Sequence, residues 1–283
     1  MAVCGAMGDP QGRALRGAPC RHHCCLIGVF DSGLGGLSVL DALASALPHA
    51  DFIYFADSAH VPYGNQPEAF VRERVLAIGD DLVRRGCDLL VVACNTATVA
   101  AVEALRAAHP GIPVVGIEPG VKPAAATTKT GRIAVLATEA TAKSARLARL
   151  VADHAQGVTV DIVPCPGWAT HVEQLDLADP ALALDVQARL APVLAAGADR
   201  LVLGCTHYSF LRPLLEAEAA GRAELVEVSA AVARQAIRLY GTRSACNGRV
   251  MLQASARPER LAAALPVLGL QALAARTTGF PLV

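Results

Sequence analysis

Short apolar runs rich in valine, isoleucine and leucine recur along the chain from residue 26 onward. Several lack any alternation of apolar and polar residues, which is typical of strands in a parallel sheet covered on both faces. The runs span residues 26–30, 51–56, 88–93, 112–117, 132–137, 158–163, 200–204 and 224–228. Helical patterns lie between them, such as residues 67–85, where Pro67 suits a first helical turn. Because strand and helix alternate, we predict a doubly wound α/β fold with parallel sheets.

The third and seventh runs belong to a repeated segment. Five residues recur 111 positions later in the same order: Gly86, Asp88, Leu90, Val91 and Cys94 match Gly197, Asp199, Leu201, Val202 and Cys205. Such a match can arise by coincidence among βα units, but the shared cysteine at the strand end favours two related halves. We therefore predict two α/β domains related by pseudo-twofold symmetry, each bringing one cysteine to a shared cleft.

The balance of charge argues against one class of partner. The 283 residues include 25 lysines and arginines and 25 aspartates and glutamates, so the formal net charge is zero. A protein held on nucleic acid by phosphate contacts needs a basic excess. No apolar stretch reaches the roughly 18–20 residues that span a bilayer, and the N-terminus lacks the apolar segment of a secretory signal. We therefore expect a cytoplasmic protein without nucleic-acid or membrane partners.

Four of the nine cysteines fall in the first 25 residues, a Gly/Pro/Arg-rich opening without periodicity. In a cytoplasmic chain the thiols stay reduced, so each is a core residue, a reactive group or a metal ligand. The segment CRHHCC at 20–25 contains metal-ligand types, but its spacing is too cramped for the usual tetrahedral zinc arrangements. We expect residues 1–25 to be a disordered leader and expect no metal site.

Two of the other cysteines stand at the ends of apolar runs. Cys94 and Cys205 each follow a predicted strand and precede small hydroxyl or amide residues. Ligands of open α/β sheets bind beyond the carboxyl ends of the strands, and a nearby helix N-terminus lowers the pKa of a thiol. The alternative is a role as a small buried hydrophobic residue, which we expect for Cys87, Cys165 and Cys246.

Polar residues gather around the same strand ends. Asn95, Thr96 and Thr206 offer neutral donors for a carboxylate. Asp31, in the segment DSGLGG, either orients a thiol or caps the next helix; the glycine spacing is not GxGxxG, which argues against a dinucleotide site. His207 lies two residues after the second cysteine and either assists its proton transfers or is structural.

Six segments together resemble the glutamate racemases of bacterial peptidoglycan synthesis: FDSGLGG, ADSAHVPYG, ACNTAT, GIEPGVKPA, LATEATAKS and GCTHY. They occur in this order, and the resemblance covers about residues 26–280. The resemblance implies two α/β domains that enclose the substrate, with two cysteines as opposed acid and base and no cofactor. It also implies that residues 118–208 form domain two, inserted into a domain one of residues 26–117 and 209–283.

The resemblance assigns roles to individual positions. Cys94 and Cys205 become the thiol pair, with Asp31 and His207 as their assistants. The substrate contacts it implies are Asp31, Ser32, Tyr63, Gly64, Asn95, Thr96, Thr138, Thr141, Thr206 and His207. Thr138 and Thr141, in ATEAT, stand where many relatives have GTxxT, with Ala137 replacing the glycine. Two further acidic cleft positions are Asp57 and Glu173, although the DSAHVPYG segment alone also fits an ordinary turn.

A racemase explains why two thiols would be needed. Inversion at an α-carbon removes a proton from one face and returns one to the other, and two cysteines can exchange these roles. We therefore predict cofactor-independent interconversion of L- and D-glutamate, with a homodimer as one expected assembly. The alternatives are a racemase of another acidic amino acid such as aspartate, a single-cysteine hydrolase acting through a thioester, and an amino-acid binding module. The segment GCTH, rather than GCTE, speaks against the aspartate enzyme.

Overall fold

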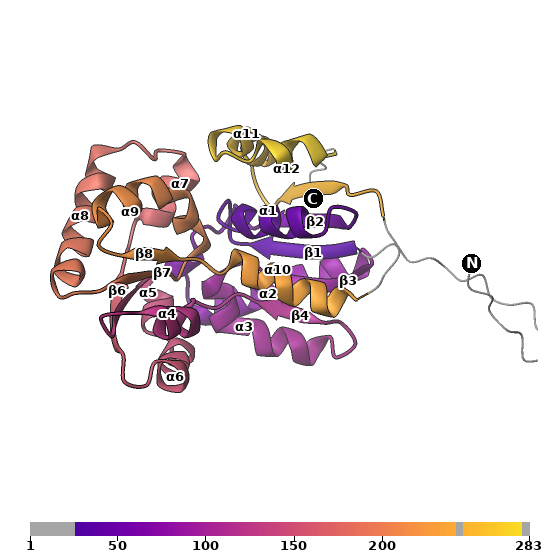
Figure 1. The fold of residues 1–283 in the computed structure, drawn as a ribbon. Coiled ribbons are helices and arrows are strands. Elements are labelled where there is room, and N and C mark those ends of the chain that lie inside the picture. The colour runs from indigo at the N-terminus through magenta and orange to yellow at the C-terminus, as the bar shows by residue number, and fades with distance from the viewer. Residues whose placement is uncertain (1–25, 242–245, 279–283) are drawn as a thin grey trace, which may run out of the picture.

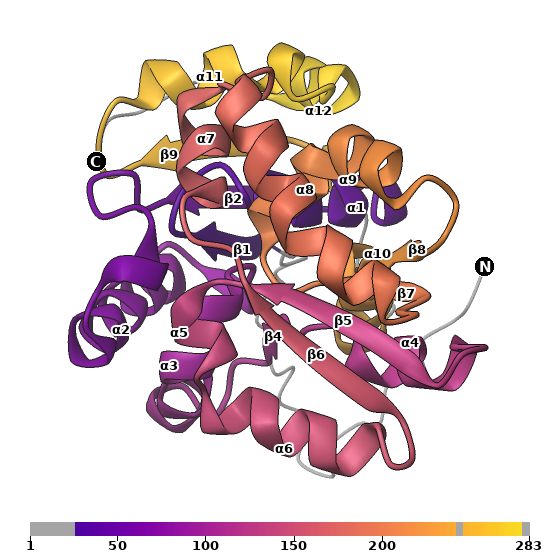
Figure 2. The same cartoon turned by 90° about the vertical axis from the view of Figure 1, so that its left-hand side faces the viewer.

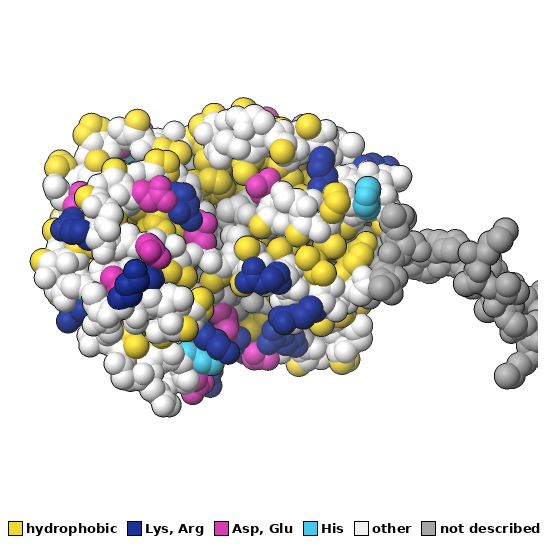
Figure 3. Space-filling view, in the orientation of Figure 1, with side chains coloured by type: hydrophobic (Ala, Val, Ile, Leu, Met, Phe, Trp, Pro, Cys, Tyr) yellow, Lys and Arg dark blue, Asp and Glu magenta, His cyan; other side chains and the backbone are white. Residues whose placement is uncertain are grey.

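The computed structural model describes residues 26–241 and 246–278, arranged around two parallel sheets (Figure 1). The first 25 residues, including CRHHCC, lie outside the described part, so the predictions made for them remain predictions. No helix in the described ranges is long and apolar enough to cross a membrane. Charges of both signs are interspersed on the face shown in Figure 3.

The first sheet has the strand order β4-β3-β1-β2-β9. Its strands are β1 (Leu26–Asp31), β2 (Asp51–Ala56), β3 (Cys87–Val92), β4 (Val114–Gly116) and β9 (Val250–Ala254), and every pairing is parallel. One face carries α1 (Leu37–Ala46), α10 (Ser229–Tyr240), α11 (Pro258–Val267) and α12 (Gln271–Arg276). The other face carries α2 (Glu68–Arg84) and α3 (Asn95–Ala108). Both faces are covered, which accounts for the unbroken apolar runs of the central strands.

The second sheet has the strand order β6-β5-β7-β8. Its strands are β5 (Arg132–Ala137), β6 (Thr159–Pro164), β7 (Arg200–Leu203) and β8 (Glu224–Val226). One face packs on α4 (Val121–Thr127) and α6 (Ala145–His154). The other packs on α7 (Trp168–Gln174), α8 (Pro180–Ala195) and α9 (Arg212–Ala219). Three short helices complete the chain: η1 (Tyr63–Asn65), α5 (Glu139–Ala142) and η2 (Thr206–Leu211). The predicted α/β fold with two parallel sheets is confirmed.

The two sheets share one topology. If β1, β2, β3 and β4 are matched with β5, β6, β7 and β8, the order β4-β3-β1-β2 becomes β8-β7-β5-β6, which is the order of the second sheet. In this match β3 corresponds to β7, and these are the two strands that carry the repeated segment. The sequence repeat therefore corresponds to equivalent βα units in two similar sheets.

The division of the chain differs from the expectation at one boundary. We expected domain one to resume at residue 209, but β8 (Glu224–Val226) pairs with β7, so the second sheet extends beyond that position. The physical reason is the repeat itself, because β8 is the counterpart of β4 and completes the second sheet. The first sheet resumes only at β9, which the apolar pattern did not predict and which adds an edge strand beside β2.

Candidate active site

The carboxyl ends of β1 and β3 face those of β5 and β7 across the boundary between the two sheets (Figures 1 and 2). Several hydrogen bonds join the halves there, and three of them involve predicted site residues. The Thr206 hydroxyl lies 3.4 Å from Asp31 Oδ1, and the Thr96 and Thr138 hydroxyl oxygens are 3.1 Å apart. The backbone N–H of Leu34 donates to Glu173 Oε1 over 2.6 Å. The structure therefore brings together polar residues predicted from both halves of the sequence.

Cys94 lies two residues after the end of β3 and forms the N-cap of α3. It is buried, and its sulfur accepts a hydrogen bond from the Ala97 N–H over 3.5 Å. Its thiol lies 3.9 Å from Ser32 Oγ. Burial raises the pKa of this thiol well above its usual value, and the Asp31 carboxylate raises it further. We expected the helix N-terminus to lower the pKa; that prediction is wrong for Cys94, because desolvation and the nearby acid outweigh the helix.

Cys205 follows β7 and is also buried, but a base lies beside it. Its sulfur is 3.6 Å from His207 Nδ1, and His207 Nε2 is 2.6 Å from Glu173 Oε1. Burial lowers the pKa of His207, but its hydrogen bonds to Cys205 and Glu173 raise it more, so that the net shift is well above the usual value. These three side chains form a chain of hydrogen bonds that runs from Glu173 through the imidazole to the sulfur.

Asp31 ends β1 between the two thiol environments. It is fully buried; its Oδ2 accepts from the Gly33 N–H over 2.9 Å. Burial raises the pKa of this carboxyl, although the positive charge of His207 opposes the shift. The N-cap of α1 is Gly36, so the alternative that Asp31 caps this helix is wrong. Asp31 is placed to interact with both halves of the site.

The Asn95 side chain is the clearest sign that a ligand belongs here. It is buried at the start of α3, and neither its Nδ2 nor its Oδ1 has a hydrogen-bond partner among the described residues. A buried amide without partners is costly, because its desolvation is not compensated. Asn95 lines a small space of about 10 Å³ together with Cys205 and Thr206. An unpaired amide at this position is suited to hydrogen bonding with a substrate carboxylate or ammonium group.

The two threonines of ATEAT lie on the opposite wall. Thr138 caps α5, accepting from the Thr141 N–H over 3.2 Å, and its hydroxyl also meets that of Thr141 at 3.1 Å. Through Thr96 the same hydroxyl connects to the first half. The replacement of glycine by Ala137 leaves this cap intact. Thr138 therefore stands at the boundary, whereas Thr141 is fully buried behind it.

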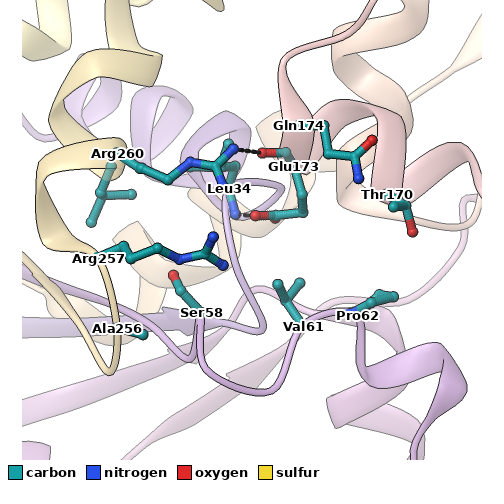
Figure 4. Close-up of a pocket in the computed structure, with 11 residues that line it drawn as sticks. Leu34, Ser58, Val61, Pro62, Thr170, Glu173, Gln174, Ala256, Arg257 and Arg260 are labelled. Atoms are coloured by element: carbon teal, nitrogen blue, oxygen red, sulfur yellow. Dashed lines mark hydrogen bonds between the residues drawn. The ribbon is translucent and has the colours of Figure 1, made fainter.

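Glu173 and Asp57, the two further acidic residues, both have hydrogen-bond partners. Glu173 lies on α7 beside a cavity of about 180 Å³, and Figure 4 shows Arg260 donating to its backbone oxygen. The Asp57 carboxylate binds Arg74 through both oxygens and accepts from the Tyr63 hydroxyl over 2.6 Å. Because the Tyr63 side chain is buried and bound to Asp57, any substrate contact from this residue comes through its backbone.

The remaining cysteines were expected to be small buried residues. Cys87 and Cys165 are buried, and burial raises the pKa of Cys87 to about 12. The prediction is wrong for Cys246, which is only partly buried. One group of possible metal ligands occurs in the described part of the chain, His171, Asp176 and Asp179, whose ligand atoms lie within 4.8 Å of one another. It lies at the C-terminal end of α7 and the loop that follows, and includes neither thiol.

Comparison with known proteins identifies the family. The family model for Asp/Glu/hydantoin racemases matches residues 27–236. The chain belongs to this family. It is 46% identical to a glutamate racemase of Pseudomonas aeruginosa over 246 residues, which is 86% of this chain and 93% of the relative. The racemase class expected from the sequence is therefore confirmed.

Solved structures of the family agree with the fold. The crystal structure of Escherichia coli glutamate racemase with L-glutamate and the activator UDP-MurNAc-Ala is similar, with a TM-score of 0.76, 32% identity and coverage of 92% of this chain and 98% of that one. Glutamate racemase isoform RacE1 of Bacillus anthracis gives a TM-score of 0.80 at 27% identity, covering 92% and 97% of the two chains. Both similarities extend over the two sheets and the boundary between them.

Proposed function

We propose that the protein interconverts L- and D-glutamate, with Cys94 and Cys205 acting as acid and base on opposite faces of the α-carbon. The observation that carries the proposal is the placement of both thiols, buried, at equivalent strand ends of two similar sheets that face each other. Relatives named glutamate racemase support the substrate. The proposed reaction uses no cofactor.

The two thiols are proposed to differ in the free enzyme. In the proposed mechanism the His207 imidazole beside Cys205 takes up the proton of that thiol, which leaves the sulfur to act as the base. Cys94, with its raised pKa, is held as a thiol beside Asp31. In one direction the Cys205 thiolate takes the α-proton and the Cys94 thiol delivers its proton to the opposite face. In the reverse direction the two cysteines exchange roles, and the proton count is unchanged.

Neutral hydrogen-bond donors are proposed to hold the substrate. Asn95, Thr96 and Thr206 lie beside the thiols, with the backbone around Ser32 and Gly64 completing the contacts. The α-proton of an amino acid is weakly acidic, so positioning and preorganised donors in a site without bulk water must stabilise the developing carbanion. The burial of both cysteines and of Asp31 supports such a dry site.

The biological role follows from the substrate. D-glutamate is a building block of bacterial peptidoglycan, and we propose that the protein supplies it from the cytoplasm, either alone or as a homodimer. An aspartate racemase remains the second candidate; it is less favoured because His207 occupies the position where we expect an acidic residue in those enzymes. Parallel assays with L-aspartate separate the two candidates.

The direct test is incubation of the pure protein with L-glutamate in D₂O, with optical rotation and α-deuterium followed together. The proposal predicts loss of rotation to zero, with deuterium entering the α-position as inversion proceeds. Activity should survive exhaustive dialysis, chelators and borohydride. Loss of activity under borohydride would indicate a Schiff base, and inversion of aspartate but not glutamate would favour the second candidate.

A further inference from the structure

Among the ion pairs in the described part of the chain, the one between Arg74 and Asp57 has the most deeply buried carboxylate. The guanidinium binds the carboxylate through two bonds, Nε to Oδ2 and Nη2 to Oδ1, both of 2.9 Å. The Asp57 side chain is fully buried, while 27% of Arg74 is exposed on α2. Two parallel bonds to a carboxylate fix its orientation as well as its charge.

Asp57 stays ionised in spite of its burial. Burial raises the pKa of this carboxyl, but the hydrogen bonds from Arg74 and Tyr63 lower it more, and the net shift is downward. With Arg74 removed, a buried carboxylate would lose its counter-charge and either reorient or take up a proton. The orientation of Asp57 therefore depends on a residue 17 positions later in the chain.

Asp57 in turn anchors the loop that carries Tyr63 and Gly64. Its backbone N–H donates to the Asp31 carbonyl over 3.0 Å, and its carboxylate accepts from the Tyr63 hydroxyl over 2.6 Å. One end of the loop is thus attached to β1 and the other to the ion pair. A Cβ atom placed on Gly64 would lie 3.0 Å from Thr138 Cβ, so the loop packs closely on the second half.

We propose that Arg74 is a positioning residue for substrate binding: by orienting Asp57 it holds the Tyr63–Gly64 segment against Thr138, where the backbone of the segment meets the substrate. The proposal rests on the proposed racemase function. Arg74 does not touch the reacting atoms, and its effect passes through Asp57 and Tyr63. No feature of the sequence pattern singled it out, because it occupies a polar position of an amphipathic helix.

The test compares Arg74→Met and Arg74→Lys with the wild type in both reaction directions. We expect KM to rise about tenfold in Arg74→Met, a loss equivalent to roughly 1.4 kcal/mol, with kcat within about threefold of the wild type. Arg74→Lys keeps the charge but loses the two-bond geometry, so its KM should lie between those of the wild type and Arg74→Met. Arg85→Met is the matched control, because it removes an exposed arginine–aspartate pair next to the C-terminal end of α2; its KM should not change.

A second variant separates positioning from general stability. Tyr63→Phe removes the hydrogen bond from the Tyr63 hydroxyl to Asp57, which is the next contact after the Arg74–Asp57 pair. The double variant with Arg74→Met should therefore raise KM no further than Arg74→Met alone. Additive effects, an unchanged KM in folded Arg74→Lys and Arg74→Met, or a loss confined to kcat would each overturn the proposal. Racemisation by the wild type is measured in the same series, so a wild type without activity would refute the proposed function instead.

Discussion

The thiols at 94 and 205 have different neighbours although they occupy equivalent positions. Cys94 has an acid and a hydroxyl beside it, whereas Cys205 has an imidazole supported by Glu173. Equivalent backbone positions thus place the two thiols in different electrostatic surroundings. In the proposed mechanism one thiol must accept a proton while the other delivers one, and this difference suits the two roles.

Replacing Glu173 should therefore act through the imidazole. Glu173 helps to raise the pKa of His207, so Glu173→Gln should lower that pKa. When pH is raised, the imidazolium of the variant should then lose its proton at a lower pH than that of the wild type. We expect kcat/KM to fall about tenfold or more, and the limb of its pH profile that reports His207 to move to lower pH. Glu118→Gln, which removes an acid paired with Arg146 instead, should leave the profile in place. An unmoved limb in Glu173→Gln would contradict this role.

The unpaired amide of Asn95 leads to a different kind of prediction. Asn95→Ala removes a buried polar group that has no described partner, so the free protein should lose no stability and its Tm should stay equal or rise. The same change should raise KM for glutamate about tenfold or more, because a substrate hydrogen bond is lost. Thr98→Ala is the contrasting variant: its hydroxyl donates to the Val92 carbonyl, so Tm should fall and KM should stay constant. A fall in Tm for Asn95→Ala without a change in KM would show that the amide is structural.

At the scale of the elements, the loop between β1 and α1 must approach the second half closely. A Cβ atom at Gly35 would lie 2.4 Å from His207 Nδ1 and 2.7 Å from Thr206 Oγ1. Gly35→Ala should therefore force these groups apart and lower kcat/KM about 100-fold, as displacements near 1 Å can do, while both sheets remain folded. Gly111→Ala, where a Cβ would meet nothing within 4 Å, should keep full activity. Normal kinetics in Gly35→Ala would mean that the halves need not approach this closely.

Most elements could be predicted because they depend on local pattern. The eight apolar runs all form strands. In the central strands β1, β5 and β7, burial on both faces requires apolar sequence, whereas β6 and β8 at the edges of the second sheet are only partly buried. The edge strand β9 was missed, because its pairing with the distant β2 leaves no local signal. We placed the return of the chain to domain one at residue 209, which is too early, because β8, the counterpart of β4, still pairs in the second sheet.

The site residues could be predicted by position but not by environment. Strand ends and duplication singled out both cysteines, and the motifs added their neighbours. The pKa of Cys94 was predicted in the wrong direction, because it depends on burial and on Asp31, which reach the thiol only through tertiary structure. Arg74 was missed for the same reason, since its contact with Asp57 joins a helix to a distant strand end.

At the scale of the whole molecule, each half supplies one thiol, and the hydrogen bonds between them cross the boundary at several points. Neither half alone contains both thiols. In the proposed mechanism the two halves, which share one topology, provide a base on each side of a substrate held between them. The division of labour between the cysteines is therefore the central claim, and it can be tested without relying on racemisation.

The measurement is elimination from the two enantiomers of a β-chloro or N-hydroxy glutamate analogue by Cys94→Ala and Cys205→Ala. Both variants should lose racemisation, since inversion needs an acid and a base, but the remaining thiol should still deprotonate the enantiomer that presents its hydrogen to it. We predict opposite preferences, with Cys205→Ala acting on the D-enantiomer through Cys94 and Cys94→Ala acting on the L-enantiomer through Cys205. The same preference in both variants, or full racemase activity in either, would contradict a two-thiol mechanism.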